Sequence, residues 1–82
     1  MHCYQINLQL GWGGGEVYSR FFSEALQANG IPTTLFVHAD NPHWARQSPP
    51  GVTLRPVRTL AEVAAALPAG PCWLLFHTPA RP

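Results

Sequence analysis

Strand-like segments alternate along this chain with segments that have the periodicity of an α-helix. The expected strands are residues 2–10, 33–39, 52–57 and 72–76, and the expected helices between them are residues 16–29, 42–47 and 59–67. Strands joined through helices lie parallel, because a parallel connection needs a crossover segment. We therefore expect residues 1–82 to form a single, incomplete α/β domain. Its Rossmann-like parallel sheet has about four strands in the order 3-2-1-4, with two main helices.

The composition excludes several classes of function. The net charge is +1, and the five basic residues are all arginines scattered along the chain, so no basic patch predicts a nucleic-acid partner. No apolar run reaches the roughly 18 residues of a membrane-spanning helix, and the N-terminus lacks a signal-peptide pattern, so we expect a cytoplasmic protein. Cys3 and Cys72 have neither zinc-site nor redox-motif spacing, and we expect two buried thiols and no metal.

The first expected helix has an apolar stripe at intervals of three and four residues. Such a stripe normally faces the core, and it consists of Val17, Tyr18, Phe21, Phe22, Ala25 and Leu26. Asn29 and Gly30 end this helix, with Gly30 placed as a left-handed cap. Thr59 and Glu62 have the spacing of a capping box, which predicts the start of the last helix.

Two segments stand at the carboxyl ends of expected neighbouring strands. The glycine-rich residues 11–15 follow the first strand, and His77 follows the fourth. In the order 3-2-1-4 these strands lie side by side, and ligands of open α/β sheets bind where the chain leaves such a pair in opposite directions. The sequence therefore predicts one crevice that is shared by the glycine loop and His77.

Each of these residues has a chemical use in such a crevice. Backbone N–H groups of Gly13, Gly14 and Gly15, before a helix, attract phosphate. Glu16 either contacts the ligand or only complements the helix dipole, and His77 either exchanges a proton at the reacting centre or is a solvated loop residue. The loop itself has a plain alternative as a tight turn without ligand.

Polar residues also follow the second expected strand. His38 and Asp40 are placed where a ribose hydroxyl would be bound, although polar residues commonly end strands. We favour the structural interpretation for both of them.

Several of these segments together resemble retaining glycosyltransferases of the GT-B type, which use nucleotide-sugar donors. The resemblance covers nearly the whole chain in order. It rests on Gly13-Gly14-Gly15-Glu16 before a helix, on the turn at Gly30, and on the strands 34–37 and 75–79, the latter reading Leu-Phe-His-Thr-Pro. It implies the acceptor-side, N-terminal domain of such an enzyme, with the glycine loop near the donor diphosphate and His77 near the transferred sugar. Family members often have an acidic residue soon after that histidine, where this chain has Thr78 and Pro79.

The resemblance also implies what the chain needs as partners. A nucleotide-sugar donor, an acceptor and a second, C-terminal donor domain complete such an enzyme, and we expect no resident cofactor and no turnover by the 82 residues alone. Two alternatives remain open. One is an NAD- or FAD-binding Rossmann domain with Asp40 on the ribose, although Glu16 stands where that fingerprint has its third glycine. The other is a non-catalytic interaction module with exposed apolar surface.

Overall fold

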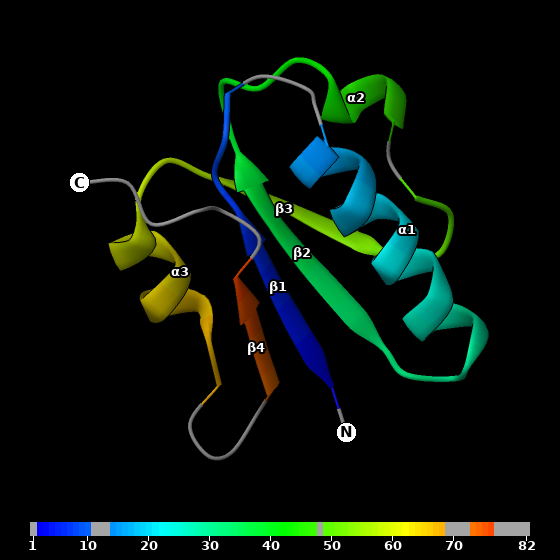
Figure 1. The fold of residues 1–82 in the computed structure, drawn as a ribbon. Helices are drawn as coiled ribbons and strands as arrows, with labels where there is room; N and C mark the ends of the chain where they lie inside the picture. The colour runs from blue at the N-terminus through cyan, green and yellow to red at the C-terminus, as the bar shows by residue number, and fades with distance from the viewer. Residues whose placement is uncertain (1, 11–13, 48, 69–72, 77–82) are drawn as a thin grey trace.

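A computed structural model describes residues 2–10, 14–47, 49–68 and 73–76 of the chain, and Figure 1 shows its ribbon. Within these ranges, four strands alternate with three helices. In chain order the elements are β1 (Cys3–Asn7), α1 (Gly14–Ala28), β2 (Thr33–His38), α2 (Trp44–Gln47), β3 (Thr53–Val57), α3 (Leu60–Ala66) and β4 (Trp73–Phe76). The α/β class is confirmed. β1 is shorter at both ends than residues 2–10, and α2 begins two residues later than expected.

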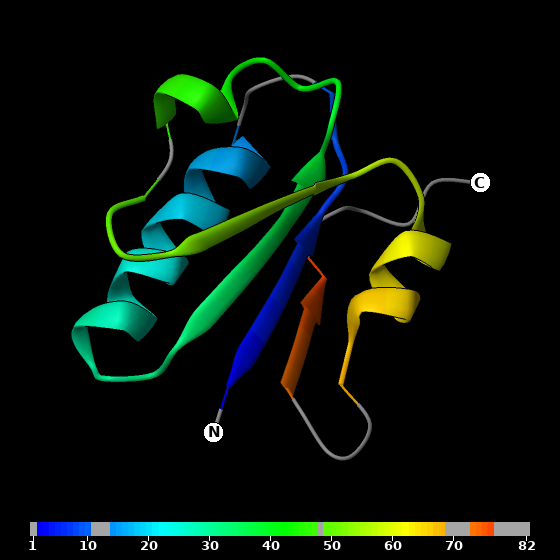
Figure 2. The same ribbon diagram turned by 180° about the vertical axis from the view of Figure 1, so that it is seen from behind.

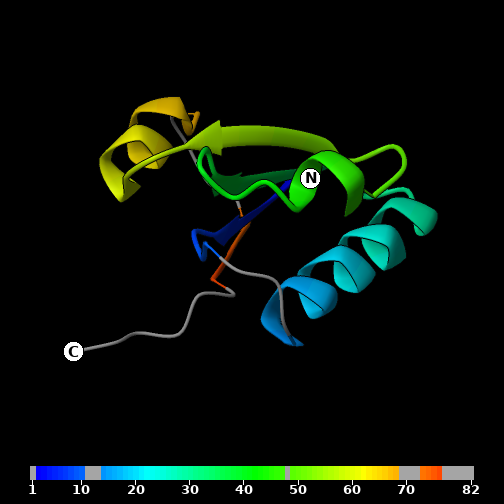
Figure 3. The ribbon, with the colours of Figure 1, turned by 90° about the horizontal axis from the view of Figure 1, so that it is seen from above.

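The strands form one parallel sheet in the order β3-β2-β1-β4. β1 lies between β2 and β4, with Gln5 opposite Leu35 on one side and opposite Leu75 on the other. Seen from above, α1 and α3 lie on opposite sides of the sheet (Figure 3), and the view from behind in Figure 2 shows the same arrangement. Right-handed crossovers place the two helices in this way. The chain crosses the sheet in one direction from β1 through β2 to β3, and it crosses back in the other direction to reach β4.

Alternate residues of β2 divide the core into two clusters, because successive side chains of a strand point to opposite faces. On the α3 face, Phe36 packs with buried residues of three other elements, Ile6, Val57 and Val63. On the other face, Leu35 and Val37 pack against Trp44 of α2. The uninterrupted apolar run of β2 is thus explained by burial on both faces.

Local signals correctly predicted the start of α3 and the end of α1. The Thr59 hydroxyl accepts a hydrogen bond from the backbone N–H of Glu62, which confirms the capping contact at the start of α3. The Glu62 carboxylate accepts in return from the backbone N–H of Arg58, one residue earlier than in the standard box. Gly30 has a φ of 76° after the end of α1, so the left-handed cap is confirmed as well.

The predicted orientation of α1 is wrong. Val17, Tyr18 and Phe21, which were expected in the core, are 52%, 57% and 73% exposed. The side of α1 that faces the sheet instead buries Ser19 and Ser23 completely. The helix therefore buries its two serines in place of Val17, Tyr18 and Phe21.

The polar side chains of β1 explain this orientation. Gln5 and Asn7 are fully buried on the α1 face, where Gln5 Nε2 donates to Ser23 Oγ and Asn7 Nδ2 donates to Ser19 Oγ at 3.0 Å. An apolar helix face over these amides would leave buried donors unsatisfied, at about 1–3 kcal/mol each. The serines are four residues apart and so share one helix face, which lets them bond both amides.

Candidate functional site

The carboxyl ends of β1 and β4 are neighbours in the sheet. Ile6 lies opposite Phe76, the last residue of β4, and β1 ends one residue further on at Asn7. The segments that follow both strands therefore start from the same edge. Gly13 and His77 themselves lie outside the described residues, so their predicted meeting stays a prediction.

The remaining three predicted site residues form the first turn of α1. The helix begins at Gly14 and includes Gly15 and Glu16. Its first N–H groups have no partner within the helix, and the macrodipole adds partial positive charge there. This end of α1 follows β1 by a short connection, so it belongs to the carboxyl edge of the sheet (Figure 1). The arrangement can attract an anion such as phosphate.

Side-chain hydrogen bonds tie the segment after β1 to α1 and to the segment before α2. Asn7, at the end of β1, donates to Ser19 and accepts from the backbone N–H of Gln9. The carbonyl oxygen of Gln9 accepts from the side chain of Asn41 at 2.9 Å, and Asn41 in turn accepts from the N–H of His43 at 3.0 Å. We call these four bonds the polar series. It fixes the path of the chain next to the candidate site.

Sequence reasoning missed the polar series. The signal that was present is the pair of amides, Gln5 and Asn7, in an otherwise apolar β1, because buried amides need partners. Asn41 has the residue type and position of a helix cap before α2. Its Oδ1 does accept from His43, as an N-cap side chain does, but its Nδ2 reaches Gln9, 32 residues earlier in the chain.

His38 and Asp40 lie at the same edge but make structural contacts. The backbone N–H of Asp40 donates to His38 Nδ1 at 3.1 Å, so a neutral His38 carries its proton on Nε2. The Asp40 carboxylate forms an ion pair with Arg58 at 2.9 Å, and both side chains are more than half exposed. A ribose hydroxyl would have to compete with that guanidinium for Asp40.

A pocket of about 350 Å³ opens at the carboxyl end of β2, between α2 and β3. Its walls are mostly apolar and include Val37, Trp44, Leu54 and Pro56. The polar residues His38 and Asn41 also line it. Its volume falls within the range of about 300–1,000 Å³ that is usual for small-molecule sites. Sequence reasoning gave Trp44 no role, because a single aromatic residue in a short connection carries no spacing signal.

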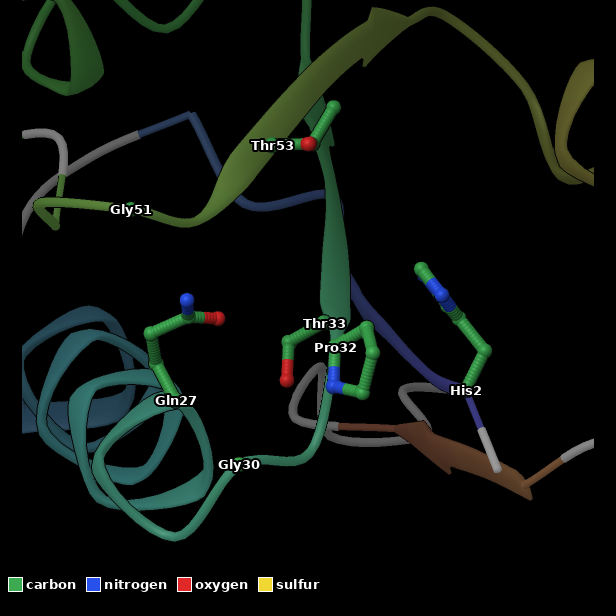
Figure 4. Close-up of a pocket in the computed structure, with 7 residues that line it drawn as sticks. All are labelled: His2, Gln27, Gly30, Pro32, Thr33, Gly51 and Thr53. Carbon is green, nitrogen blue, oxygen red and sulfur yellow. The ribbon is translucent and has the colours of Figure 1, made fainter.

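A second pocket lies at the opposite, amino end of the strands (Figure 4). It measures about 220 Å³, and its lining includes His2, Gln27, Thr33 and Thr53. His2 Nε2 is engaged with the Thr34 hydroxyl at 2.8 Å. Ligands of parallel sheets bind at the carboxyl ends, so this smaller hollow is not the candidate site.

Of the two cysteines, Cys3 lies within the described residues, at the amino end of β1, and Cys72 lies outside them. Cys3 is a fully buried free thiol, and burial raises its pKa, so it stays protonated and unreactive at neutral pH. Among the residues that the structure describes, no group of three or more His, Cys, Asp or Glu side chains is placed to hold a metal ion. No helix in the described ranges has the length and apolar character needed to cross a bilayer.

Comparison with known proteins found no match to a family model, a curated protein or a solved structure.

Proposed function

We propose that the chain is the N-terminal, acceptor-side part of a GT-B-type retaining glycosyltransferase that uses a nucleotide-sugar donor. In this proposal the chain acts with a second α/β domain and has no turnover by itself. The residues that resemblance assigns are Gly13, Gly14, Gly15 and Glu16 at the donor diphosphate and His77 at the transferred sugar. A cytoplasmic location belongs to the same proposal.

One observation carries the proposal: β1 and β4 are parallel neighbours, so the segments after them leave from the same edge. With α1 and α3 on opposite faces, the order β3-β2-β1-β4 is that of the first four strands of a doubly wound, Rossmann-like sheet. The start of α1 at Gly14 adds an anion-attracting helix end at that edge. Glycines there leave room for a diphosphate to approach the backbone.

The chemistry required of these residues is modest. The N–H groups at the start of α1 would hold the negative charge of the leaving nucleoside diphosphate, which develops as the sugar–phosphate bond breaks. Fixed donors at a helix end cost little reorganisation during the reaction. His77 would donate a hydrogen bond to the sugar or exchange a proton beside it.

The binding half of the proposal is tested by NMR titration of the isotope-labelled chain. UDP-glucose, GDP-mannose, ADP-glucose and NAD are added separately, and backbone amide shifts are followed. We expect one nucleotide sugar to shift the amides of Gly14, Gly15 and Glu16 saturably. The amides of Gly30 and Gly51, at the amino end of the strands, should stay unchanged and serve as an internal reference.

A matched pair of variants separates the helix end from the rest of α1. Gly14→Val and Ala25→Val both place a β-branched side chain in this helix, but only the first one does so at its N-terminus. The first should abolish the shifts and the second should leave them intact. Saturable shifts with NAD alone would replace the proposal by the dinucleotide-binding alternative, and silence to all four probes would count against both.

The partner half is tested on the genomic DNA beyond codon 82. A continuation, in frame or frameshifted, that encodes another α/β domain with spaced glutamates supports the proposal. The interaction module is the second candidate, and the exposed apolar side of α1 is the observation that favours it.

A further inference from the structure

The exposed side of α1 carries bulky side chains towards its N-terminal end and small side chains towards its C-terminal end. Val17 and Phe21 are one helical turn apart, and Ala25 and Ala28 continue the same face towards the C-terminal end of the helix. All four side chains are exposed. We call these four residues the α1 stripe. Its bulky residues, Val17 and Phe21, lie nearer the N-terminal end of the helix, and its small residues, Ala25 and Ala28, lie nearer the C-terminal end.

The orientation of the stripe is enforced from the opposite side of the helix. Ser19 and Ser23 are held against β1 by their hydrogen bonds to Asn7 and Gln5. The stripe faces roughly the other way, because successive residues turn by about 100° around a helix. Figures 1 and 3 both show α1 at the periphery, and no other described helix or strand lies on the side of α1 away from the sheet.

Arg20 and Glu24 border the stripe on one flank. They form an ion pair at 3.1 Å, with side chains 42% and 39% exposed. Arg20 also donates to the side-chain oxygen of Gln47 at the end of α2. The flank is therefore the side of α1 towards α2, and it carries one charge of each sign.

We propose that the α1 stripe binds a second copy of this chain, with the two α1 helices antiparallel about a two-fold axis. Such an axis places the N-terminal half of each helix against the C-terminal half of the other. Val17 of one copy then fits between Ala25 and Ala28 of the other copy. Phe21 of each copy packs between Phe21 and Ala25 of the other. Parallel pairing would set bulky residues against bulky ones.

The charges on the flank fit the same arrangement. A two-fold axis between antiparallel helices keeps equivalent flanks on the same side, so Arg20 of one copy faces Glu24 of the other. The two copies then share four alternating charges. In a parallel pair the two-fold axis runs along the helices and sets the equivalent flanks on opposite sides, so Arg20 and Glu24 of different copies would not face each other.

The exposed area sets the strength of the association. Aromatic side chains bury about 150–250 Å² each, so Val17, Phe21 and the adjacent Tyr18 expose roughly 350 Å² per copy. The total area that two copies could bury between them is below the roughly 1,200 Å² of a stable interface. The dimer is therefore weak, and we expect it to form at hundreds of micromolar and to be absent at about 10 μM.

Sedimentation velocity on the full chain over this concentration range tests the proposal. The apparent mass should rise from monomer towards dimer. Phe21→Glu should keep the chain monomeric throughout, whereas Leu60→Glu, at a 55% exposed leucine of α3, should leave association unchanged. Circular dichroism at low concentration confirms that both variants fold.

Charge variants test the antiparallel geometry. Arg20→Glu and Glu24→Arg should each weaken self-association at least several-fold, because all four facing charges then have one sign. A mixture of the two variants should form the dimer again, as should the variant that carries both changes. Repair of the ion pair within one chain cannot explain the mixture, since each chain in it still has like charges.

Three outcomes would overturn the proposal. They are a monomer at all concentrations, association that Phe21→Glu leaves intact, and a mixture of the charge variants that stays monomeric. A stripe that binds only a different protein would give the first of these results.

Discussion

The inward-facing serines of α1 predict an unusual ranking of two substitutions. Ser19→Ala should destabilise the chain more than Phe21→Ala does. Ser19 is fully buried and accepts from Asn7, so its loss leaves a buried amide N–H without its partner. This costs about 1–3 kcal/mol. Phe21 is 73% exposed, and its replacement should change the stability by no more than about 0.5 kcal/mol.

Helix propensity increases the contrast. Alanine is the best helix former, so Phe21→Ala is expected to be neutral or slightly stabilising. If α1 instead buried its apolar side, the same change would remove a core phenylalanine at about 3–5 kcal/mol. The two orientations of the helix therefore differ by several kcal/mol in a single variant.

Urea unfolding of both variants and the parent chain measures this difference. Circular dichroism reports the transition at about 10 μM, a concentration at which the proposed dimer is not expected to form. A chain of this size shifts its melting temperature by about 4–8 °C for each kcal/mol, so thermal melts give an independent ranking. Phe21→Ala costing more than Ser19→Ala would refute the assigned orientation of α1.

A double-mutant cycle locates the effect at the contact with β1. Asn7→Leu, Ser19→Ala and the variant with both changes are compared with the parent. The double variant should lose less than the two single losses added together, with a coupling energy of at least about 0.5 kcal/mol. Additive losses would mean that the two side chains do not interact.

Three further expectations concern local features. Thr59→Ala should lower the unfolding free energy by about 1 kcal/mol through loss of the cap of α3, and an unchanged urea midpoint would contradict that contact. In a Cys72→Ser background, Cys3 should resist iodoacetamide until the chain is unfolded. Because its pKa is raised by burial, stability should also fall as the pH rises past 9.0, and Cys3→Ala should flatten that fall. Gly51→Ala should lower the unfolding free energy more than Gly30→Ala does. Both glycines have a positive φ, but only at Gly51 would the new Cβ contact the Gln27 side chain, at 3.3 Å. Gln27→Ala should therefore remove the difference between the two variants.

Much of the fold could be predicted because its signals are local. The expected strand 33–39 contains the apolar run Leu35-Phe36-Val37, which is typical of a strand covered on both faces, and residues on each face of β2 are buried. Thr59 with Glu62 indicated a helix start, since a cap involves residues only three apart. The alternation of elements then predicted a parallel sheet through chain connectivity alone.

The orientation of α1 could not be predicted in the same way. Its apolar stripe indicated one direction, but the partner surface on β1 is polar, and the deciding bond joins Asn7 to Ser19, 12 residues apart. A pattern within one helix carries no information about the surface that receives it. Gln5 and Asn7 alternate with apolar residues in β1, a pattern that normally predicts solvent exposure, whereas this strand is buried on both faces.

The sequence predicted the location of the candidate site in the fold better than it predicted the residues that form it. Connectivity implied that the ends of β1 and β4 meet, and the register of the two strands shows those ends side by side. Gly14, Gly15 and Glu16 were expected near that edge and form the first turn of α1. The polar series from Asn7 to His43 was missed, because it joins residues that are distant in the sequence.

The serine and amide contacts beneath α1 have a dynamic consequence. Water can replace each of these hydrogen bonds when the helix lifts from the sheet, so undocking loses little net hydrogen-bond energy. In α3, Val63 packs among Ile6, Phe36 and Val57. Water cannot replace these apolar contacts when α3 leaves the sheet. Amide protons of α1 should therefore exchange with solvent by partial opening, ahead of those in β2, and any group bound at the start of α1 would slow that opening.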